Sequence, residues 1–319
     1  MKLSLIIPVL NEEENIPHVV EALDAAFAGE QDVALEIVFV DDGSRDGTFA
    51  VLSALVKKDA RLRIIRFSRN FGSHAALLAG FEHCTGDAAA YLAADMQEPP
   101  SVLCQMIVKW RDGAQVVWGT REHRDDPLSA RLFSRIYSSL MRRIALKDMP
   151  RTGLDLCLID RKVIHAVVEM REKNTSIFGL ILWAGFAQAF VPYSRQARKH
   201  GKSRWTLSKK IKLVVDSFVA FSFFPIRLVT YLGLCLSAAG FCYGLFVAVR
   251  ALLGYTPVQG WASVVTLIVM LSGVQLLMLG IVAEYLWRTF DETRQRPPFV
   301  IRDLAGFETV GTLPRIPHA

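Results

Sequence analysis

Two long stretches without a charged residue constrain this chain more than any other feature. Residues 228–249 and 262–283 each contain 22 residues without Asp, Glu, Lys or Arg, and only a short loop separates them. A helix that crosses a bilayer needs about 20 mostly apolar residues. Two buried helices of a large soluble core are the alternative, but two such stretches around one short loop favour a helical hairpin in lipid. We therefore predict a transmembrane hairpin over residues 227–287.

Basic residues flank the hairpin on one side. Residues 195–212 contain eight Lys or Arg, whereas the loop between the apolar stretches carries only Arg250. Arg288, Arg294 and Arg296 follow the second stretch. Lys and Arg are enriched in cytoplasmic loops. We therefore predict a protein of the inner (cytoplasmic) membrane with two transmembrane helices, whose N-terminal domain and two termini lie in the cytosol.

Composition argues against several classes of protein. The chain has 319 residues, of which 52% are hydrophobic, so it is too apolar for an ordinary soluble enzyme and long enough for a large domain beside the hairpin. The five cysteines form no CxxC pair, and therefore neither a disulfide framework nor a zinc cluster is expected. The net charge is +6, and the basic residues gather beside the hairpin, which indicates a membrane surface or an anionic substrate rather than nucleic acid.

Strand-like and helix-like segments alternate before the hairpin. Apolar runs typical of buried strands are followed by segments whose apolar residues have helical spacing. This alternation predicts an α/β domain over residues 1–210, with a mostly parallel sheet covered on both faces. The expected strands are 3–10, 35–42, 62–68, 88–95 and 114–121, and the expected helices are 13–28, 46–59, 73–84 and 100–113.

Two further segments complete the predicted organisation. Residues 211–226 mix apolar residues with a few charges, which is typical of an amphipathic helix at a membrane interface. Residues 288–319 contain two adjacent prolines and few apolar residues, and we expect a loosely ordered cytosolic tail there.

Polar side chains follow each predicted strand. The carboxyl ends of parallel strands share one edge of an open α/β sheet, and ligands bind at that edge. A carboxylate there can accept hydrogen bonds from a nucleobase or from ribose hydroxyls. The clusters are Asn11 with Glu12, Asp41 with Asp42, Arg69 with Asn70, Asp95 with Gln97, and Arg121.

In this order, the motifs resemble those of family 2 glycosyltransferases with the GT-A (Rossmann-like) fold, in the branch that glycosylates polyprenyl phosphates. That branch includes dolichyl-phosphate mannose synthases and the bactoprenol glucosyltransferases of O-antigen modification, and the hairpin is similar to that of the bactoprenol-linked members. The resemblance covers essentially the whole chain. The matching segments are PVLNE at 8–12, VDDGSRDGT at 40–48, RNFG at 69–72, TGDAAAYLAADMQEPP at 85–100, GTR at 119–121, TGLDLCLIDR at 152–161 and VPYSRQARKHGKSRW at 191–205.

The resemblance implies an inverting, membrane-anchored glycosyltransferase. Such an enzyme moves one sugar from a nucleotide-sugar donor to undecaprenyl phosphate at the cytosolic face of the membrane. UDP-glucose is the expected donor, and UDP-N-acetylhexosamines and other donors remain open. The expected partners are the donor, undecaprenyl phosphate and the lipid bilayer, without nucleic acid. Family members of this type often form tetramers, which implies a homo-oligomer.

The resemblance also assigns roles to individual residues. Arginine forks match phosphate oxygens and hard cations prefer oxygen ligands, so the residue types suit these roles. The expected donor-binding residues are Pro8, Leu10, Asn11, Glu12, Asp41, Asp42, Asn70 and Arg121. The expected phosphate- or acceptor-binding residues are Arg195, Arg198, Lys202 and Arg204. Asp95 and Gln97 are expected to face the diphosphate and its divalent cation, Mg²⁺ or Mn²⁺, and Asp95 and Asp155 are the expected catalytic residues. For Arg198 and Arg204, a position facing solvent or lipid headgroups is the alternative.

Asp155 is expected to orient the acceptor or the donor sugar, with base catalysis secondary. A phosphate monoester has its second pKa near ~6 and is largely ionised at neutral pH, so it needs little help to lose a proton. A buried structural carboxylate is the alternative.

The chain departs from the family pattern at two positions. Relatives usually have Asp-x-Asp before the glutamine, whereas Ala93 occupies the first position here. One carboxylate is missing, and weaker metal affinity is expected, with Glu98 as a candidate further ligand. Many relatives have Arg where Cys157 stands, which implies the loss of one phosphate contact.

Two other functions compete with the leading interpretation. A polysaccharide-extending family 2 synthase usually carries QxxRW after the catalytic acid and more membrane spans, and QARKH and SRW do not form that motif. A catalytically silent scaffold that binds a nucleotide or lipid draws support from Ala93 and Cys157. Detectable donor hydrolysis or lipid-phosphate glycosylation would exclude the scaffold.

Overall fold

The chain divides into two compact units, each described by itself below. The first comprises Met1–Leu213 and Pro297–Ala319, and the second comprises Val214–Arg296, so the second unit is inserted into the first along the chain. The computed structural model describes residues 1–121, 156–170, 176–194, 224–253 and 260–307, together with the single positions 139, 142, 149, 172 and 222.

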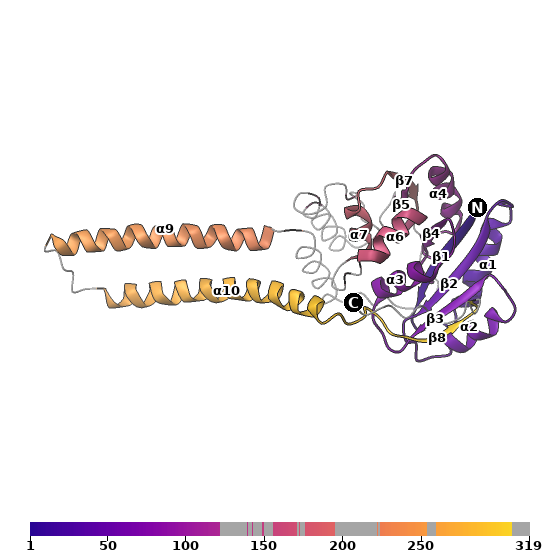
Figure 1. Cartoon of the computed structure of the whole chain (residues 1–319), viewed down its shortest axis with the longest axis horizontal. Helices are drawn as coiled ribbons and strands as arrows, with labels where there is room; N and C mark the ends of the chain where they lie inside the picture. Colours follow the sequence, from indigo (N-terminus) through magenta and orange to yellow (C-terminus); the bar gives the residue numbers. More distant parts are fainter. Residues whose placement is uncertain are drawn as a thin grey trace. The chain divides into compact units, whose positions relative to one another are not determined.

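An eight-stranded mixed sheet forms the centre of the first unit (Figure 1). Its strand order is β7-β5-β6-β4-β1-β2-β3-β8, in which β6 and β8 run antiparallel to the other six strands. The prediction of an α/β fold of GT-A type with a mostly parallel sheet is confirmed. The strands are β1 (Lys2–Val9), β2 (Ala34–Asp41), β3 (Leu62–Phe67), β4 (Ala88–Tyr91), β5 (Val116–Arg121), β6 (Leu156–Asp160), β7 (Gln188–Tyr193) and β8 (Ile301–Ala305).

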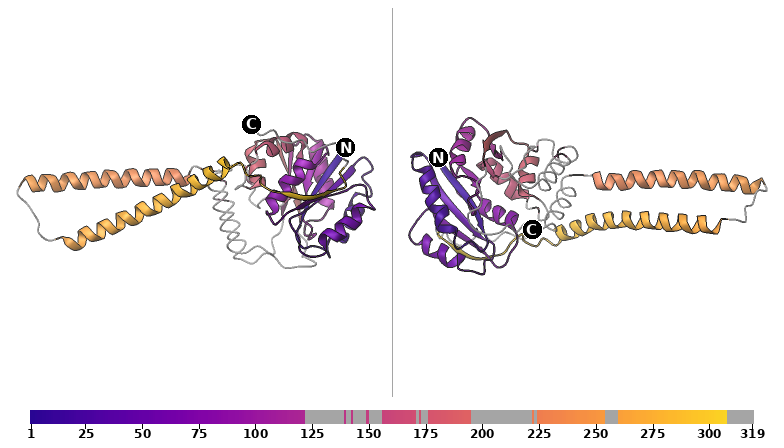
Figure 2. Two further views of the ribbon diagram at one scale, coloured as in Figure 1. Left: turned by 60° about the horizontal axis from the view of Figure 1, so that its bottom comes forward. Right: turned by 180° about the vertical axis from the view of Figure 1, so that it is seen from behind.

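Helices cover both faces of the sheet, as Figure 2 shows from two further directions. On one face, α1, α2 and α4 share an apolar core with Leu3, Leu5 and Ile7 of β1. On the other face, α3 packs with α6 and α7, and Gly80 of α3 approaches Ile6 so closely that a Cβ would overlap the Ile6 side chain. β1 is therefore buried on both faces, as expected for a central parallel strand. The helices are α1 (Ile16–Phe27), α2 (Thr48–Val56), α3 (Ser73–His83), α4 (Ser101–Arg111), α6 (Arg161–Met170) and α7 (Ile177–Trp183).

A buried carboxylate joins β2 to its neighbours near the amino ends of the strands. Glu36 is 2% exposed and accepts hydrogen bonds from Ser4 Oγ at 2.5 Å, Thr85 N–H at 2.7 Å and Arg63 Nε at 2.9 Å. Burial by itself raises the pKa of Glu36, but hydrogen bonds from Ser4 and Thr85 and the charge of Lys2 together lower it to about 2. The folded protein therefore favours the ionised carboxylate.

The C-terminal segment closes one edge of the sheet. β8 pairs with β3, and Phe299 stacks on Phe67 with ring centroids 5.1 Å apart. Arg63 also donates a hydrogen bond to the carbonyl of Gly306. The tail that was predicted to be loosely ordered is therefore docked over 299–307, because the edge of β3 offers unpaired backbone groups to any strand that reaches it.

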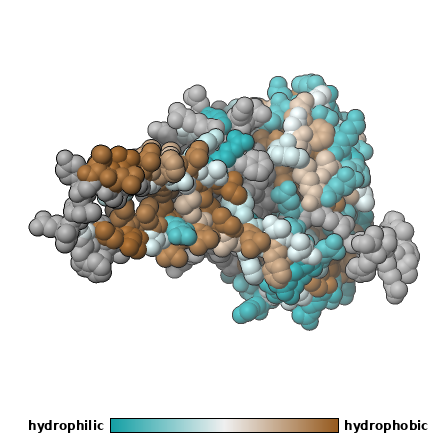
Figure 3. Space-filling view, turned by 60° about the vertical axis from the view of Figure 1, so that its left-hand side comes forward, coloured by the Kyte–Doolittle hydropathy of each residue, from teal (hydrophilic) through white to brown (hydrophobic). Residues whose placement is uncertain are grey.

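The second unit contains two long apolar helices, α9 (Phe224–Leu252) and α10 (Trp261–Thr293). Segments Ile226–Tyr243 and Met270–Thr293 are each long and apolar enough to cross a membrane. Their apolar side chains lie exposed, for example Phe241 at 74%, and Figure 3 shows hydrophobic residues gathered along these helices. Apolar surface of this extent marks contact with lipid or protein. The helices match the two-helix hairpin expected from the sequence.

Replacing Glu36 should destabilise the first unit in a pH-dependent way. Because the pKa of Glu36 is lowered from 4.5 to about 2, the ionised carboxylate contributes stability above pH 4.5, worth about 3 kcal/mol, which is lost as the pH falls toward 2. Glu36→Gln should therefore lower the melting temperature at pH 7, and the difference from the wild type should shrink on acidification. Intrinsic fluorescence during heating measures the melting temperature of each protein at each pH. Glu21→Gln, at an exposed position, is the control. A difference that stays constant down to pH 3 would contradict this role.

Candidate functional site

The sheet reverses its strand order between β1 and β4. Along the chain, β1, β2 and β3 extend in one direction from β1, and β4 pairs with the other side of β1. In open α/β sheets, a ligand crevice forms outside the carboxyl ends of the strands at this reversal. The loops after β1, β2, β3 and β4 therefore form the candidate functional site.

The loop after β1 is fastened to the loop after β2. Asn11, at φ +50°, donates its N–H to Ser44 Oγ at 2.9 Å, and its Oδ1 accepts the N–H of Arg45 at 2.8 Å. Two more bonds join the same loops, from Gly47 N–H to Glu13 Oε2 at 2.7 Å and from Glu12 N–H to Thr48 Oγ1 at 2.9 Å. Ser44, Glu13 and Thr48 were not predicted as site residues; Ser44 and Thr48 lie within the VDDGSRDGT motif, and Glu13 directly follows PVLNE. These bonds hold the predicted donor-binding residues Asn11 and Glu12 in one place.

Asp42 fastens the loop after β2 to the loop after β3. Its two carboxylate oxygens accept the N–H groups of Phe71 at 2.6 Å and Gly72 at 2.9 Å. Gly43, at φ +77°, makes this approach possible, because a Cβ there would lie 2.6 Å from the backbone carbonyl carbon of Arg69. The RNFG motif is thus held by its backbone, and Asn70 remains exposed at its tip.

The carboxylate of Asp42 is buried at 5% exposure. Burial raises its pKa to about 6, with a further increase from the neighbouring Asp41, while the Phe71 and Gly72 N–H groups and the charge of Arg69 partly oppose the change. A carboxylate with a raised pKa in a ligand crevice is a candidate functional group. Its remaining lone pairs can accept hydrogen bonds from a nucleobase or a ribose.

Asp41, the last residue of β2, is completely buried. Its Oδ1 accepts the N–H of Ser44 at 2.8 Å, and its Oδ2 lies 3.4 Å from Nε of Arg66. Asp41 was predicted to bind the donor, which stays a prediction. In the structure it shapes the loop that carries Ser44.

The loop after β4 carries Asp95 and Gln97. The strand itself ends at Tyr91, four residues earlier than the predicted end at 95; the chain then turns at residues 94–95, and Met96 adopts φ +55°. Asp95 Oδ1 accepts the N–H of Gln97 at 3.3 Å, and both side chains are half-buried. Glu98 is buried at 3% exposure.

The other predicted donor residues flank this site. Pro8 lies in β1, and Leu10 follows that strand; both are half-buried. Arg121 is the last residue of β5, opposite Tyr193 of β7, so it reaches the same edge two strands away from β4. The sheet thus brings the predicted clusters to one edge.

Five predicted site residues lie outside the described residues: Asp155, Arg195, Arg198, Lys202 and Arg204. Their roles stay predictions, as does the amphipathic helix at 211–226, of which only Ser222 and residues 224–226 are described. Cys157 is described and fully buried in β6 opposite Trp118, and burial raises its pKa to about 12. In this chain, position 157 therefore belongs to the core.

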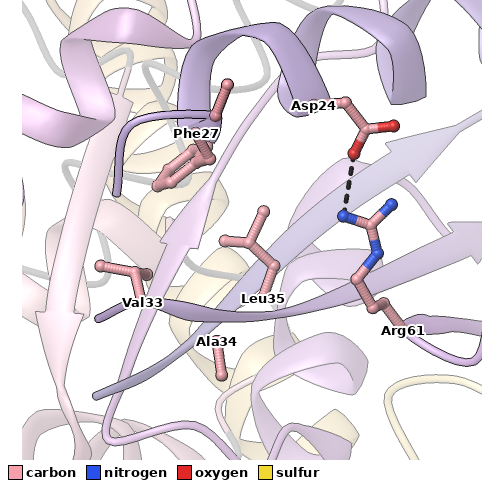
Figure 4. Close-up of a pocket in the computed structure, with 7 residues that line it drawn as sticks. Asp24, Phe27, Val33, Ala34, Leu35 and Arg61 are labelled. Atoms are coloured by element: carbon pink, nitrogen blue, oxygen red, sulfur yellow. Dashed lines mark ion pairs between the residues drawn. The ribbon is translucent and has the colours of Figure 1, made fainter. Parts of the chain in front are cut away.

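A cavity of about 400 Å³ opens at the opposite end of the strands (Figure 4). It is lined by apolar residues, including Phe27 and Leu35, with an ion pair of 2.8 Å between Asp24 and Arg61. Arg61 also pairs with Asp59 at 2.6 Å, so its charge is already matched by two carboxylates. The cavity therefore lacks the surplus positive charge that a phosphate-bearing ligand would need.

Comparison with known proteins identifies two matching sequence families. Residues 4–167 match "Glycosyl transferase family 2", and residues 224–288 match "GtrB C-terminal hairpin". An uncharacterized glycosyltransferase of Synechocystis sp. is 34% identical over 310 residues, which cover 97% of this chain and 97% of that protein. The bactoprenol glucosyl transferase of Shigella phage SfX is 34% identical over 303 residues, which cover 95% of this chain and 99% of that protein.

The raised pKa of Asp42 predicts a pH effect opposite in sign to that of Glu36. Ionised Asp42 is disfavoured in the folded protein, so the fold should gain up to about 3 kcal/mol from this residue as the pH falls from about 6 to below 3.8. Asp42→Asn removes this titration. The melting temperature of the wild type should therefore rise relative to that of the variant between pH 7 and pH 4. A constant difference between the melting temperatures of the two proteins from pH 7 to pH 4 would contradict the raised pKa. Asp112→Asn, at an exposed position, is the control.

Proposed function

This chain belongs to glycosyl transferase family 2, and we propose that it transfers a sugar from a nucleotide-sugar donor to undecaprenyl phosphate at the cytosolic face of the membrane. One observation carries the proposal. The similarity to the bactoprenol glucosyl transferase spans 95% of this chain, and therefore includes both the catalytic unit and the apolar hairpin. A lipid-linked acceptor requires both parts, since its phosphate must reach the enzyme while its tail stays in the bilayer.

The loops after β1, β2 and β3 would bind the nucleotide. Asp42 and Asn11 present hydrogen-bonding oxygens from a framework that their own backbone contacts hold rigid. Such preorganisation lowers the cost of ordering a loop when a ligand binds. UDP-glucose is the proposed donor, because the relatives whose transferred sugar is named are glucosyl transferases.

Asp95 and Gln97 fit a divalent cation by their donor chemistry. Both carry oxygen donors on the loop after β4, next to the point where the strand order reverses. Among the described residues, no group of three or more His, Cys, Asp or Glu could hold a metal ion. The other ligands would be the donor's diphosphate oxygens and water, a set that suits Mg²⁺ or Mn²⁺. When bound, the cation would offset the negative charge that develops on the leaving diphosphate.

The acceptor would approach along the basic segment. We propose that Arg195, Arg198, Lys202 and Arg204 contact the undecaprenyl phosphate or the lipid headgroups beside it. With the basic flanks of the hairpin on the cytosolic side, the catalytic unit and both termini would lie in the cytosol. Transfer forms a bond between an acceptor phosphate oxygen and the sugar's anomeric carbon as the bond to the diphosphate breaks, with inversion at that carbon.

A donor panel tests the proposed function. The purified full-length protein is mixed with undecaprenyl phosphate and radiolabelled nucleotide-sugars, with Mg²⁺, with Mn²⁺ or with a chelator. We expect UDP-glucose to label the lipid and the chelator to reduce the labelling, and we expect Asp95→Asn to need more metal for the same rate. Failure of every donor to label the lipid would overturn the proposal.

Asp155→Asn separates positioning from base catalysis. If Asp155 mainly orients the substrates, the variant should lose about ten- to hundredfold in kcat and keep a measurable rate across the pH range. Asp160→Asn is the control, because the Asp160 carboxylate accepts bonds from Trp110 Nε1 at 2.9 Å and from Lys162 N–H at 2.9 Å and so has a structural role. Complete loss of activity at every pH in a folded Asp155→Asn protein would argue against positioning alone.

A further inference from the structure

Arg66 connects the C-terminal strand to the candidate site. It lies on β3 between two carboxylates, with Nε 3.4 Å from Oδ2 of the buried Asp41 and Nη1 3.5 Å from Oδ2 of Asp303 on β8. Its guanidinium carbon also lies 4.2 Å from the ring centroid of Phe49 on α2. Three separate elements therefore fix the direction of this one side chain.

Asp41 connects Arg66 to the loops of the site. The Asp41 side chain is fully buried, and a buried carboxylate is strongly unfavourable without a cationic or hydrogen-bonding partner. One oxygen faces Arg66, and the other accepts the N–H of Ser44. Ser44 Oγ in turn accepts the N–H of Asn11. An unbroken series of polar contacts thus runs from β8 to the loops after β2 and β1.

The residues of β8 reach this position only after the chain has passed through the hairpin. The chain re-enters the first unit at Pro297, and Phe299 and Asp303 then meet β3. A strand that served only to cover the edge of β3 would need backbone pairing alone. The carboxylate of Asp303 adds a charge contact to the arginine that faces Asp41.

We propose that Asp303 and Arg66 are positioning residues for the donor site: the C-terminal strand holds Arg66 against Asp41 and so fixes the loops at Ser44 and Asn11 in their donor-binding arrangement. This role rests on the proposed function, since it takes the loops after β1 and β2 as the nucleotide site. Neither residue touches the donor. Loss of the Asp303 charge should loosen the loops and weaken donor binding, while the chemistry of transfer continues in the complexes that form.

The decisive variant is Asp303→Asn in the full-length protein, and Asp24→Asn is its matched control. Asp24 also pairs with an arginine beside β3, Arg61, at 2.8 Å, but at the opposite end of the strand. The two carboxylates are similarly exposed, at 42% for Asp303 and 51% for Asp24. Each variant therefore removes one half-exposed negative charge from an arginine of β3 or beside it; Asp303 also lies 3.6 Å from Nε of its neighbour Arg302.

Two measurements distinguish positioning from general stability. Hydrogen–deuterium exchange should become about threefold or more faster in peptides covering residues 10–15 and 42–47 of Asp303→Asn, with no such change in Asp24→Asn. The donor KM should rise about three- to tenfold in Asp303→Asn with kcat within about twofold of the wild type. Asp303→Glu restores the charge and should bring both the exchange rates of these peptides and the donor KM back toward the wild-type values.

The outcomes separate this inference from the proposed function. Unchanged exchange at the two loops of Asp303→Asn, or equal loosening in Asp24→Asn, would overturn the inference whatever the activity. A fall in kcat at constant donor KM would also overturn it, because the effect would then lie in the chemical step. If the wild type transfers no sugar at all, the proposed function fails, and the exchange experiment still decides whether β8 fixes the loops.

Discussion

Two buried carboxylates on β2, Glu36 and Asp41, require positively charged partners, and β3 supplies both. Arg63 donates to Glu36 at 2.9 Å, and Arg66 lies 3.4 Å from Asp41. An unpaired buried charge is among the most costly features a protein interior can contain. Because the same two arginines also contact the C-terminal segment, the register of β2 against β3 and the docking of β8 depend on one set of charges.

The candidate site lies next to the ion pair of Asp41 and Arg66 and contains one further carboxylate, that of Asp42, whose burial is unfavourable. Asp42 is buried next to Asp41, and burial is the main reason that its pKa rises to about 6. Its bonds to the backbone of Phe71 and Gly72 hold the third loop but do not fully offset that burial. Further hydrogen-bond donors from a ligand would favour the ionised form of this carboxylate. The hydrogen bonds between the loops hold these polar groups in place.

Local patterns in the sequence predicted much of this arrangement. Five buried strands were expected from apolar runs, and β1 to β5 occupy those segments. β4 ends at Tyr91, earlier than expected, and the chain turns at residues 94–95, followed by Met96 at φ +55°. β6, β7 and β8 were not predicted as strands, because short segments that pair with distant strands carry little periodicity of their own. Likewise, Ser44 was invisible as a partner of Asn11, since 33 residues separate them in the chain.

The sequence by itself determined the classes of element and the residues that could carry chemistry. Charge-free stretches of 22 residues determine two apolar helices, and polar residues after apolar strands mark the binding edge. Only the tertiary structure decided which polar groups face each other. In the tertiary structure, Asp41 lies against Arg66, and the Asp42 oxygens accept N–H groups from the loop after β3. Asp303 lies beside β3, although it follows the hairpin in the chain. The physical reason is that local periodicity determines burial, whereas the pairing of buried charges depends on distances between residues that lie far apart in the chain.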